Sequence, residues 1–314
     1  MKLRAYLLML FVVAVWGSTF VVVKGALGDA TPAAFNLIRM ALAFVLLAAL
    51  YHRFWRGMKA WQVGAGAMVG FCLALGYQFQ TTGLARTTPS KSAFITGLLV
   101  VLVPFLSLIP GLRPPGARRP RWNAFLGAAL AFLGIILLTA PTALRAQGSG
   151  FGSVLTALLP DLSSINFGDV LTLGCAVGFA FHCIALSHFS PRIGFQPLAL
   201  LQVGFCALFM ALSLPFMERP QIHWTPRLGM ALAIAAVLAT AAAFSIQSWV
   251  QAVLPSTHTA LLLTMEPVFA WITSFLVMGE RLSLRPSCGA LLILAGIALT
   301  ELFPQPHLPT AHEA

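Results

Sequence analysis

The sequence predicts an all-α membrane protein whose ten transmembrane helices form two inverted five-helix repeats. Of its 314 residues, 9% are charged and 59% are hydrophobic, whereas a soluble domain has about 25% charged residues. Apolar stretches long enough to cross a bilayer follow one another along the chain. Similar residues also recur at a nearly constant spacing in the two halves. The composition excludes a soluble enzyme and a disordered chain, and it argues against a nucleic-acid partner despite a net charge of +11.

The first half contains five stretches of about the 20 residues that a membrane helix needs. They are Ala5–Val23, Pro32–Tyr51 (with Arg39 inside it), Trp61–Ala85, Ser92–Leu112 and Trp122–Leu144. The N-terminal segment has basic residues followed by an apolar run, as a signal peptide does. No cleavage pattern of small residues follows the run, so we expect a retained helix. The basic segment Gly111–Arg121 lies between two spans, and we interpret it as a topology anchor instead of a nucleic-acid-binding patch.

The second half continues the series of helices. Val170–Pro191 and Ile193–Met217 each suit one helix, but Leu228–Met265 is too long for one. It divides at Pro255, because proline disfavours helix in the residue before it, and its second part runs on to Met278. A last helix covers Leu284–Phe303. We therefore predict a first repeat over 1–145, a second over 165–303 and a tail over 304–314.

Basic residues in the loops predict the orientation, because cytoplasmic loops are enriched in Lys and Arg. With the N-terminus inside, the first half places nine basic residues inside and four outside. The second half has the opposite bias, with only Arg192 inside. Since the first helices usually dominate, we expect both termini in the cytoplasm and a location in the cell inner membrane.

The fifth and tenth helices carry the clearest internal repeat. GAALAFLGIILL at 127–138 matches GALLILAGIALT at 289–300, a shift of 162 residues. Shifts of 161 and 163 place Gly17 on Gly178 and Pro104 on Pro267. Because each repeat holds an odd number of helices, the second copy enters the membrane upside down. Inverted repeats are typical of secondary transporters, whose substrate site lies near the midplane.

Three segments carry a resemblance to a known family. VWGSTFVVVK at 15–24, GLARTTPSKSAFITGLLVVLVPFLS at 83–107 and LLLTMEPVFAWITSFLVMGERLS at 261–283 resemble the EamA branch of the drug/metabolite transporter superfamily. The resemblance implies ten helices, cytoplasmic termini and transport of small metabolites, often efflux. The family frequently has a glutamate after the fourth helix, matching Glu280 after the ninth. Here that region reads PGLRPPGARR, without an acid.

Two charged residues lie deep within predicted spans, where insertion costs about 2.5–3.5 kcal/mol each. Arg39 lies seven residues past Pro32, and Glu266 lies ten residues past Ser256. Such groups usually face the interior of the bundle. We expect Glu266 to carry a proton and Arg39 to meet a carboxylate of the substrate. Alternatively, the two residues pair with each other, or Glu266 ties the kink before Pro267 to a neighbouring backbone.

Polar and aromatic residues at mid-span are further candidates for the substrate site, because such cavities are mostly apolar with a few placed polar groups. They are Trp16, Tyr77, Gln78, Gln80, Thr96, His182, Gln202, Gln247, Trp249 and Trp271. His182 has an unperturbed pKa near 6.5 and could relay protons. Lys91 could attract an anionic substrate to the outer mouth, or extend to lipid headgroups. Each of these residues could instead pack or hydrogen-bond between helices.

Motifs for other chemistry are missing from the sequence. It has no P-loop, no HExxH and no CxxC, and its five cysteines all fall inside predicted spans. We therefore expect no cofactor and no metal site. A secondary transporter of amino acids or related amphipathic solutes, exporting them by alternating access, is the leading hypothesis. A membrane enzyme acting on lipid-like substrates is the alternative, although the eight acidic residues are scattered. The expected partners are a small-molecule substrate and the lipid bilayer, and the chain could act as a monomer or a homodimer.

Overall fold

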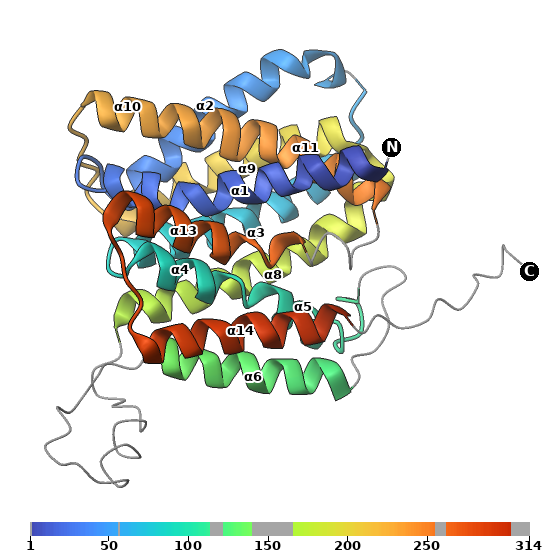
Figure 1. The fold of residues 1–314 in the computed structure, drawn as a ribbon. Coiled ribbons are helices and arrows are strands. Elements are labelled where there is room, and N and C mark those ends of the chain that lie inside the picture. The colour runs from blue at the N-terminus through green and yellow to red at the C-terminus, as the bar shows by residue number, and fades with distance from the viewer. Residues whose placement is uncertain (1, 56, 114–121, 140–165, 255–261, 303–314) are drawn as a thin grey trace, which may run out of the picture.

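The apolar segments of the sequence form long helices that run side by side across the molecule (Figure 1). The computed structural model describes residues 2–55, 57–113, 122–139, 166–254 and 262–302. The predicted tail and the junction of the two predicted repeats at 140–165 lie outside the described residues. In the first half, the elements are α1 (Lys2–Ala26), α2 (Pro32–Leu50), the short 3₁₀-helix η1 (His52–Trp55), α3 (Ala60–Leu84), α4 (Pro89–Thr96), α5 (Leu99–Leu106) and α6 (Trp122–Thr139).

The second half begins with the two long helices α8 (Phe167–Ile193) and α9 (Phe195–Met217). They are followed by α10 (Pro226–Ala233), the π-helical segment η3 (Ile234–Ala242), α11 (Ala243–Val253), α13 (Glu266–Met278) and α14 (Leu284–Leu302). Seven helical stretches of the described chain are long and apolar enough to cross a membrane, and three shorter apolar helices accompany them. The chain is therefore an all-helical, multi-pass membrane protein.

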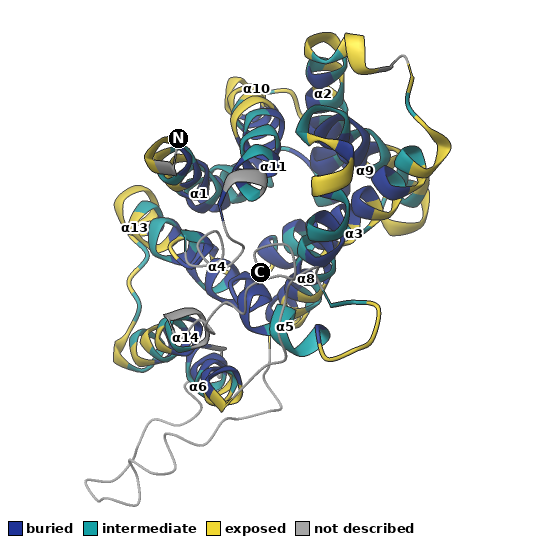
Figure 2. Ribbon diagram, turned by 90° about the vertical axis from the view of Figure 1, so that its right-hand side faces the viewer, coloured by how far each residue is buried: buried dark blue, intermediate teal, exposed yellow. Residues whose placement is uncertain are grey.

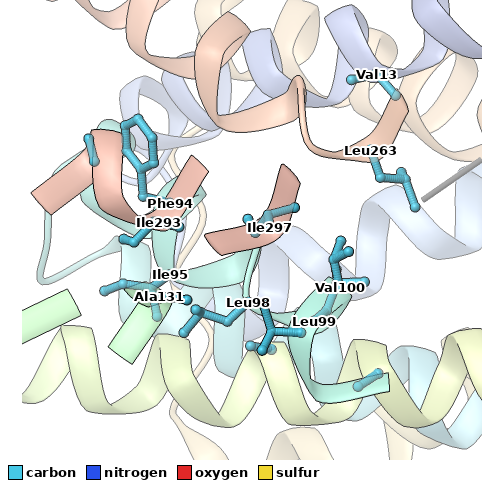
Figure 3. Close-up of a cluster of buried hydrophobic side chains, with 14 of the residues drawn as sticks. Val13, Phe94, Ile95, Leu98, Leu99, Val100, Ala131, Leu263, Ile293 and Ile297 are labelled. Carbon is cyan, nitrogen blue, oxygen red and sulfur yellow. The ribbon is translucent and has the colours of Figure 1, made fainter. Parts of the chain in front are cut away.

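Two of the predicted spans are interrupted near their middle. The fourth span breaks at Gly97 and Leu98, between α4 and α5, instead of continuing as one helix. The break lies in an apolar cluster formed by α1, α4, α5, α6, α8 and α14 (Figure 3). In the ninth span a turn at Thr264–Met265 precedes α13, whose first turn contains Pro267. Glu266 was predicted deep within a helix, but it is the first residue of α13, because proline fits the first helical turn.

The outer surface of the bundle exposes many large apolar side chains. Buried residues face the centre and exposed residues face outward, and α6 and α14 form a pair at one edge (Figure 2). Large apolar side chains such as Phe216, which is 90% exposed, and Leu284 lie on the surface. In a bilayer these side chains contact lipid tails, so their exposure carries no hydrophobic cost.

The pair formed by α6 and α14 is held together by glycines that repeat between the two halves. A Cβ atom added to Gly296 would lie 2.3 Å from the carbonyl oxygen of Gly127. One added to Gly289 would lie 2.6 Å from the carbonyl oxygen of Gly134. Because the shift of 162 residues places Gly127 on Gly289 and Gly134 on Gly296, these two contacts are equivalent to each other. Close backbone approach through small residues is a common way for membrane helices to pack.

We predict that Gly296→Val destabilises the protein, because its side chain would have to displace the backbone of α6. Overpacking of this kind costs about 1–3 kcal/mol, and thermal unfolding of the detergent-purified protein measures it. The matched control is Gly64→Val in α3, since a Cβ at Gly64 has nothing within 4 Å. Equal unfolding temperatures for the two variants would contradict the prediction.

The connections at one end of the bundle are tied together by Asp29, which lies between α1 and α2. Its carboxylate accepts hydrogen bonds from Thr225 Oγ1 (2.8 Å) and Arg227 Nε (2.9 Å). These bonds, led by that of Thr225, hold the pKa of Asp29 below its usual value. Because the folded pKa lies below the unfolded one, the carboxylate stabilises the fold at higher pH and loses this effect as the pH falls through the folded pKa. We predict that the difference in unfolding temperature between the native protein and Asp29→Asn shrinks as the pH is lowered from 7 to 3.

Candidate functional site

A cavity lies among the helices of both halves. Residues of α1, α2, α3, α4, α5, α8, α11 and α13 form its walls, together with Leu263 just before α13. Its lining comprises Trp16, Thr19, Phe20, Val23, Arg39, Tyr77, Gln80, Thr81, Leu84, Thr96, Leu99, Phe179, His182, Cys183, Phe244, Gln247, Leu263 and Glu266. The lining is mostly apolar with a few polar and charged groups, as is usual for sites that bind small organic molecules.

Arg39 brings a positive charge into this cavity from α2, although its side chain is only 3% exposed. Its guanidinium carbon lies 4.3 Å from the centre of the Tyr77 ring, a cation–π contact. Its Nε and Nη2 donate hydrogen bonds to Thr240 Oγ1 at 3.3 and 3.1 Å. Within the described part of the chain, no carboxylate lies within 4.0 Å of this guanidinium. The charge is therefore oriented by neutral groups and is not neutralised by an acid.

The π-helical segment η3 orients Arg39. Thr240 Oγ1 donates its own proton to the carbonyl oxygen of Ala235, five residues earlier, at 2.7 Å. Its lone pairs are thereby turned toward the guanidinium of Arg39. The neighbouring carbonyl of Ala239 accepts a hydrogen bond from Trp16 Nε1 at 2.8 Å. Short π-helical turns in membrane and soluble proteins often lie at functional sites, and this one fixes two residues of the cavity wall.

Glu266 brings the negative charge of the cavity from the start of α13, and its side chain is half-buried. The helix α13 packs closely on α1 here, because a Cβ added to Gly17 would lie 2.6 Å from the Glu266 carbonyl oxygen. Among the described side chains, no Lys, Arg or His nitrogen lies within 4.0 Å of the Glu266 carboxylate. Arg39 and Glu266 therefore line one cavity without forming an ion pair, and the alternative that they neutralise each other is not observed.

Aromatic rings form much of the remaining wall. Tyr77 lies edge-on to Phe179, with 5.2 Å between the ring centroids, and to Phe244, at 6.4 Å. Trp16 packs against Phe244 at 5.7 Å. These four rings come from α1, α3, α8 and α11. They offer an apolar surface for a ligand beside the two charged groups.

Two buried amides complete the polar part of the site. His182 lines the cavity, and its Nε2 lies 2.9 Å from Gln202 Oε1 on α9. Gln247 lines the cavity from α11 and is 3% exposed, yet its Oε1 has no hydrogen-bond partner in the described part of the chain. A buried acceptor without a partner is costly. This oxygen is therefore available to a donor group on a ligand.

The structure brings together seven of the predicted site residues: Trp16, Arg39, Tyr77, Thr96, His182, Gln247 and Glu266. Gln80, the other polar mid-span candidate, also lines the cavity. The remaining candidates do not. Gln78 accepts a hydrogen bond from Asn36 Nδ2 at 3.1 Å and does not line the cavity. Gln202 lies behind His182, and Trp249 packs in the apolar cluster around α5.

Lys91 and Trp271 also lie away from the cavity. Lys91 begins α4, and its Nζ is 4.0 Å from the Asp169 carboxylate. Trp271 is 40% exposed on the outer surface of α13. A helix of 13 residues has several faces, and only its first turn reaches the cavity through Glu266.

The sequence interpretation missed several lining residues of α1 and α3, although a signal for them exists. On α1 the cavity contains Trp16, Thr19, Phe20 and Val23, and on α3 it contains Tyr77, Gln80, Thr81 and Leu84. Both sets have the spacing i, i+3, i+4 and i+7 of a single helix face. Trp16 and Tyr77 were predicted to line the cavity. Thr19 follows Trp16 by three residues and Thr81 follows Tyr77 by four, so each threonine lies on the same helix face and could have been predicted from it.

Comparisons with known proteins agree with this architecture. A model of the family described as the EamA-like transporter family matches residues 3–140 and 166–302. An uncharacterized transporter of Archaeoglobus fulgidus is 31% identical over 96% of this chain and 87% of its own length. The uncharacterized transporter YdfC of Bacillus subtilis is 22% identical over 92% of this chain and 88% of its own. A solved structure titled "Crystal structure of protein" has the same fold, with a TM-score of 0.61, 19% identity and coverage of 96% of this chain and 98% of the other.

Proposed function

The chain belongs to the EamA-like transporter family and is a membrane transporter, and we propose that it carries amino acids or related amphipathic solutes through the cavity around Arg39 and Glu266. The observation that carries this proposal is the cavity itself, which places one cation, one acid and four aromatic rings around a common space. A buried charge without a charged partner is costly. A substrate carboxylate would compensate the charge of Arg39, and a proton would compensate that of Glu266.

The proposed contacts follow from the chemistry of the lining. A substrate carboxylate suits Arg39, because a guanidinium binds carboxylates through paired, charge-assisted hydrogen bonds. A substrate ammonium suits Gln247 Oε1, a buried acceptor of a lining residue that has no hydrogen-bond partner in the described chain. An apolar side chain suits the rings of Tyr77, Phe179 and Phe244.

Glu266 is the group that we propose to couple transport to protons. It lines the cavity at the start of α13, next to the interruption of the ninth span. In transporters, such interrupted helices lie at the substrate and ion sites because their unpaired backbone groups face the cavity. A carboxyl group there can bind a proton on one side of the membrane and release it on the other.

The proposed mechanism is export by alternating access between the two halves of the bundle. The equivalent glycine contacts of α6 and α14 support a two-fold relation between the predicted repeats. The bias of basic residues in the first half supports cytoplasmic termini in the cell inner membrane. With two inverted halves, an exchange of their shapes moves the opening of the cavity from one side to the other.

Uptake into proteoliposomes tests the proposal. Labelled amino acids and small amines are offered to the purified protein, with and without an imposed pH gradient. Saturable uptake that responds to the gradient supports a proton-coupled carrier. Saturable uptake that ignores the gradient supports the substrate class but overturns the role of Glu266. Saturable uptake of amines alone overturns the role of Arg39, and no uptake of any solute overturns the proposed substrate class.

A further inference from the structure

We propose that Lys24 is a latch that keeps the cavity closed toward one end of the bundle, and that releasing it opens the cavity to that side. This end, which we call the latch face, is where α1, α3, α9 and α13 finish and where α2, α4, α8 and α10 begin. The inference does not depend on which solute the protein carries. It concerns the path by which any solute reaches the cavity.

The side chain of Lys24 joins the end of α1 to the connection between α3 and α4. Its Nζ lies 2.8 Å from the carbonyl oxygen of Leu84, 3.1 Å from that of Ala85 and 2.9 Å from that of Thr87. An ammonium group has three donors, so all of them are used. Because these acceptors are backbone carbonyls, the three hydrogen bonds fix the backbone between α3 and α4 and not only a side chain.

The three hydrogen bonds of Lys24 lie at the edge of the cavity, and their proposed role follows from this position. Val23, the residue before it, lines the cavity, and so does Leu84, the first of its acceptors. The hydrogen bonds therefore cross from one wall of the cavity to another at its end nearest the latch face. Separating α1 from the connection between α3 and α4 would therefore widen this end of the cavity toward the latch face.

Acidic side chains reinforce the same face. Four of the five acids whose side chains the structure describes lie there, and Glu266 is the other. Each of the four accepts a hydrogen bond from a different element: Asp29 from Thr225, Asp169 from Thr87, Glu218 from the backbone of Ala33 and Ala34, and Glu280 from Ser90. The bond between Glu280 Oε2 and Ser90 Oγ is 2.7 Å and ties the end of α13 to the start of α4.

Charged groups at the opposite end are arranged differently. Arg4, Arg53 and Arg192 are exposed there. A hydrogen bond between the hydroxyl groups of Tyr51 and Ser245, at 3.0 Å, joins the end of α2 to α11 without a charged group. Hydrogen bonds to charged groups are stronger than those between neutral groups. The described hydrogen bonds of Lys24 and the four acids at the latch face are therefore stronger than the neutral hydrogen bond between Tyr51 and Ser245 at the other end.

Cys183 provides a built-in reporter, because it lines the cavity and is half-buried. In a variant that keeps only this cysteine, with Cys72, Cys175, Cys206 and Cys288 replaced by alanine, a membrane-impermeant thiol reagent is applied to intact cells and, separately, to inverted vesicles. A second variant carrying only Gly28→Cys, at an exposed position on the latch face, identifies which preparation presents that face. From the latch face we expect slow labelling of Cys183, and labelling at least tenfold faster after Lys24→Met.

Arg86→Met is the matched control, since it removes the same charge from the same face. The Arg86 side chain is exposed; among the described residues it donates to the carbonyl oxygen of Thr82 at 3.1 Å, and its guanidinium carbon lies 6.0 Å from the centre of the Phe167 ring. We expect Cys183 to react at the parental rate in this variant. Equal acceleration by Arg86→Met would overturn the proposal, because it would show an effect of surface charge.

Two further results would also overturn the latch: an unchanged rate in Lys24→Met, or rapid labelling of the parent from the latch face. If Lys24→Met does not fold, Glu280→Gln replaces it, since it weakens the neighbouring tie to Ser90. Acceleration supports the latch and an unchanged rate overturns it. Labelling requires no substrate, so a failure of the proposed transport activity remains distinguishable from a failure of this inference.

Discussion

Replacing Arg39 with glutamine should raise the half-saturation concentration for amino-acid uptake by on the order of 10- to 100-fold, which corresponds to the roughly 1.5–3 kcal/mol of a charged hydrogen bond. The guanidinium lines the cavity, and its positive charge has no carboxylate partner in the described chain. The effect should depend on the substrate's carboxylate. An amino-acid amide, which lacks that group, should bind the native protein and Arg39→Gln about equally.

Two variants separate the charge of Arg39 from its orientation. Arg39→Lys keeps the charge but loses the planar fork that matches a carboxylate, so an intermediate loss is expected. Thr240→Val keeps Arg39 itself but removes the acceptor of its Nε and Nη2. We expect this variant to weaken uptake less than Arg39→Gln does. Equal affinity of the native protein and Arg39→Gln for the amino acid would exclude a carboxylate site at Arg39.

Glu266→Gln should abolish accumulation driven by a pH gradient while leaving exchange of substrate across the membrane. A gradient of one pH unit supplies about 1.4 kcal/mol per proton, enough for a tenfold accumulation ratio when one proton is coupled to one substrate. Glutamine has nearly the same shape but cannot bind and release a proton at this position. The ratio should therefore fall from about ten to about one in proteoliposomes whose membrane potential is held at zero.

The control for this experiment is made on Glu266→Gln itself, because it tests whether the variant still binds and moves substrate. Exchange of labelled for unlabelled substrate in Glu266→Gln shows that the variant is folded and binds substrate. Full accumulation by Glu266→Gln would remove the proton-carrying role and leave Glu266 as a structural residue of the kink before Pro267.

One of the basic loop residues used to predict the orientation forms an ion pair in the structure. Arg227 counts against the predicted orientation, because it falls outside when the N-terminus is inside. In the structure it forms an ion pair with Asp29, with 2.9 Å between Arg227 Nη2 and Asp29 Oδ2. A count of basic residues cannot recognise such a pair, since the two residues are far apart in the chain and meet only through folding. Paired residues of this kind weaken the loop bias in the second half.

The sequence by itself determined the class of the protein and its two intramembrane charges. A low charge content and long apolar stretches leave a bilayer as the solvent, and backbone groups in a bilayer must be satisfied within helices. An ionisable residue in such a stretch is costly and turns toward the interior. For this reason Arg39 and Glu266 could be predicted to share the cavity from their positions alone, and both line it.

Only the tertiary structure decided which helix faces form the cavity and what holds its charged groups. In a membrane protein the lipid-facing and core-facing sides of a helix are equally apolar, so hydrophobic patterning could not separate Thr19 or Thr81 from surface residues. The π-helical turn that aims Thr240 at Arg39, and the three carbonyl groups around Lys24, depend on contacts between segments 60 to 201 residues apart. Local sequence does not encode such contacts, because they form only when distant helices pack together.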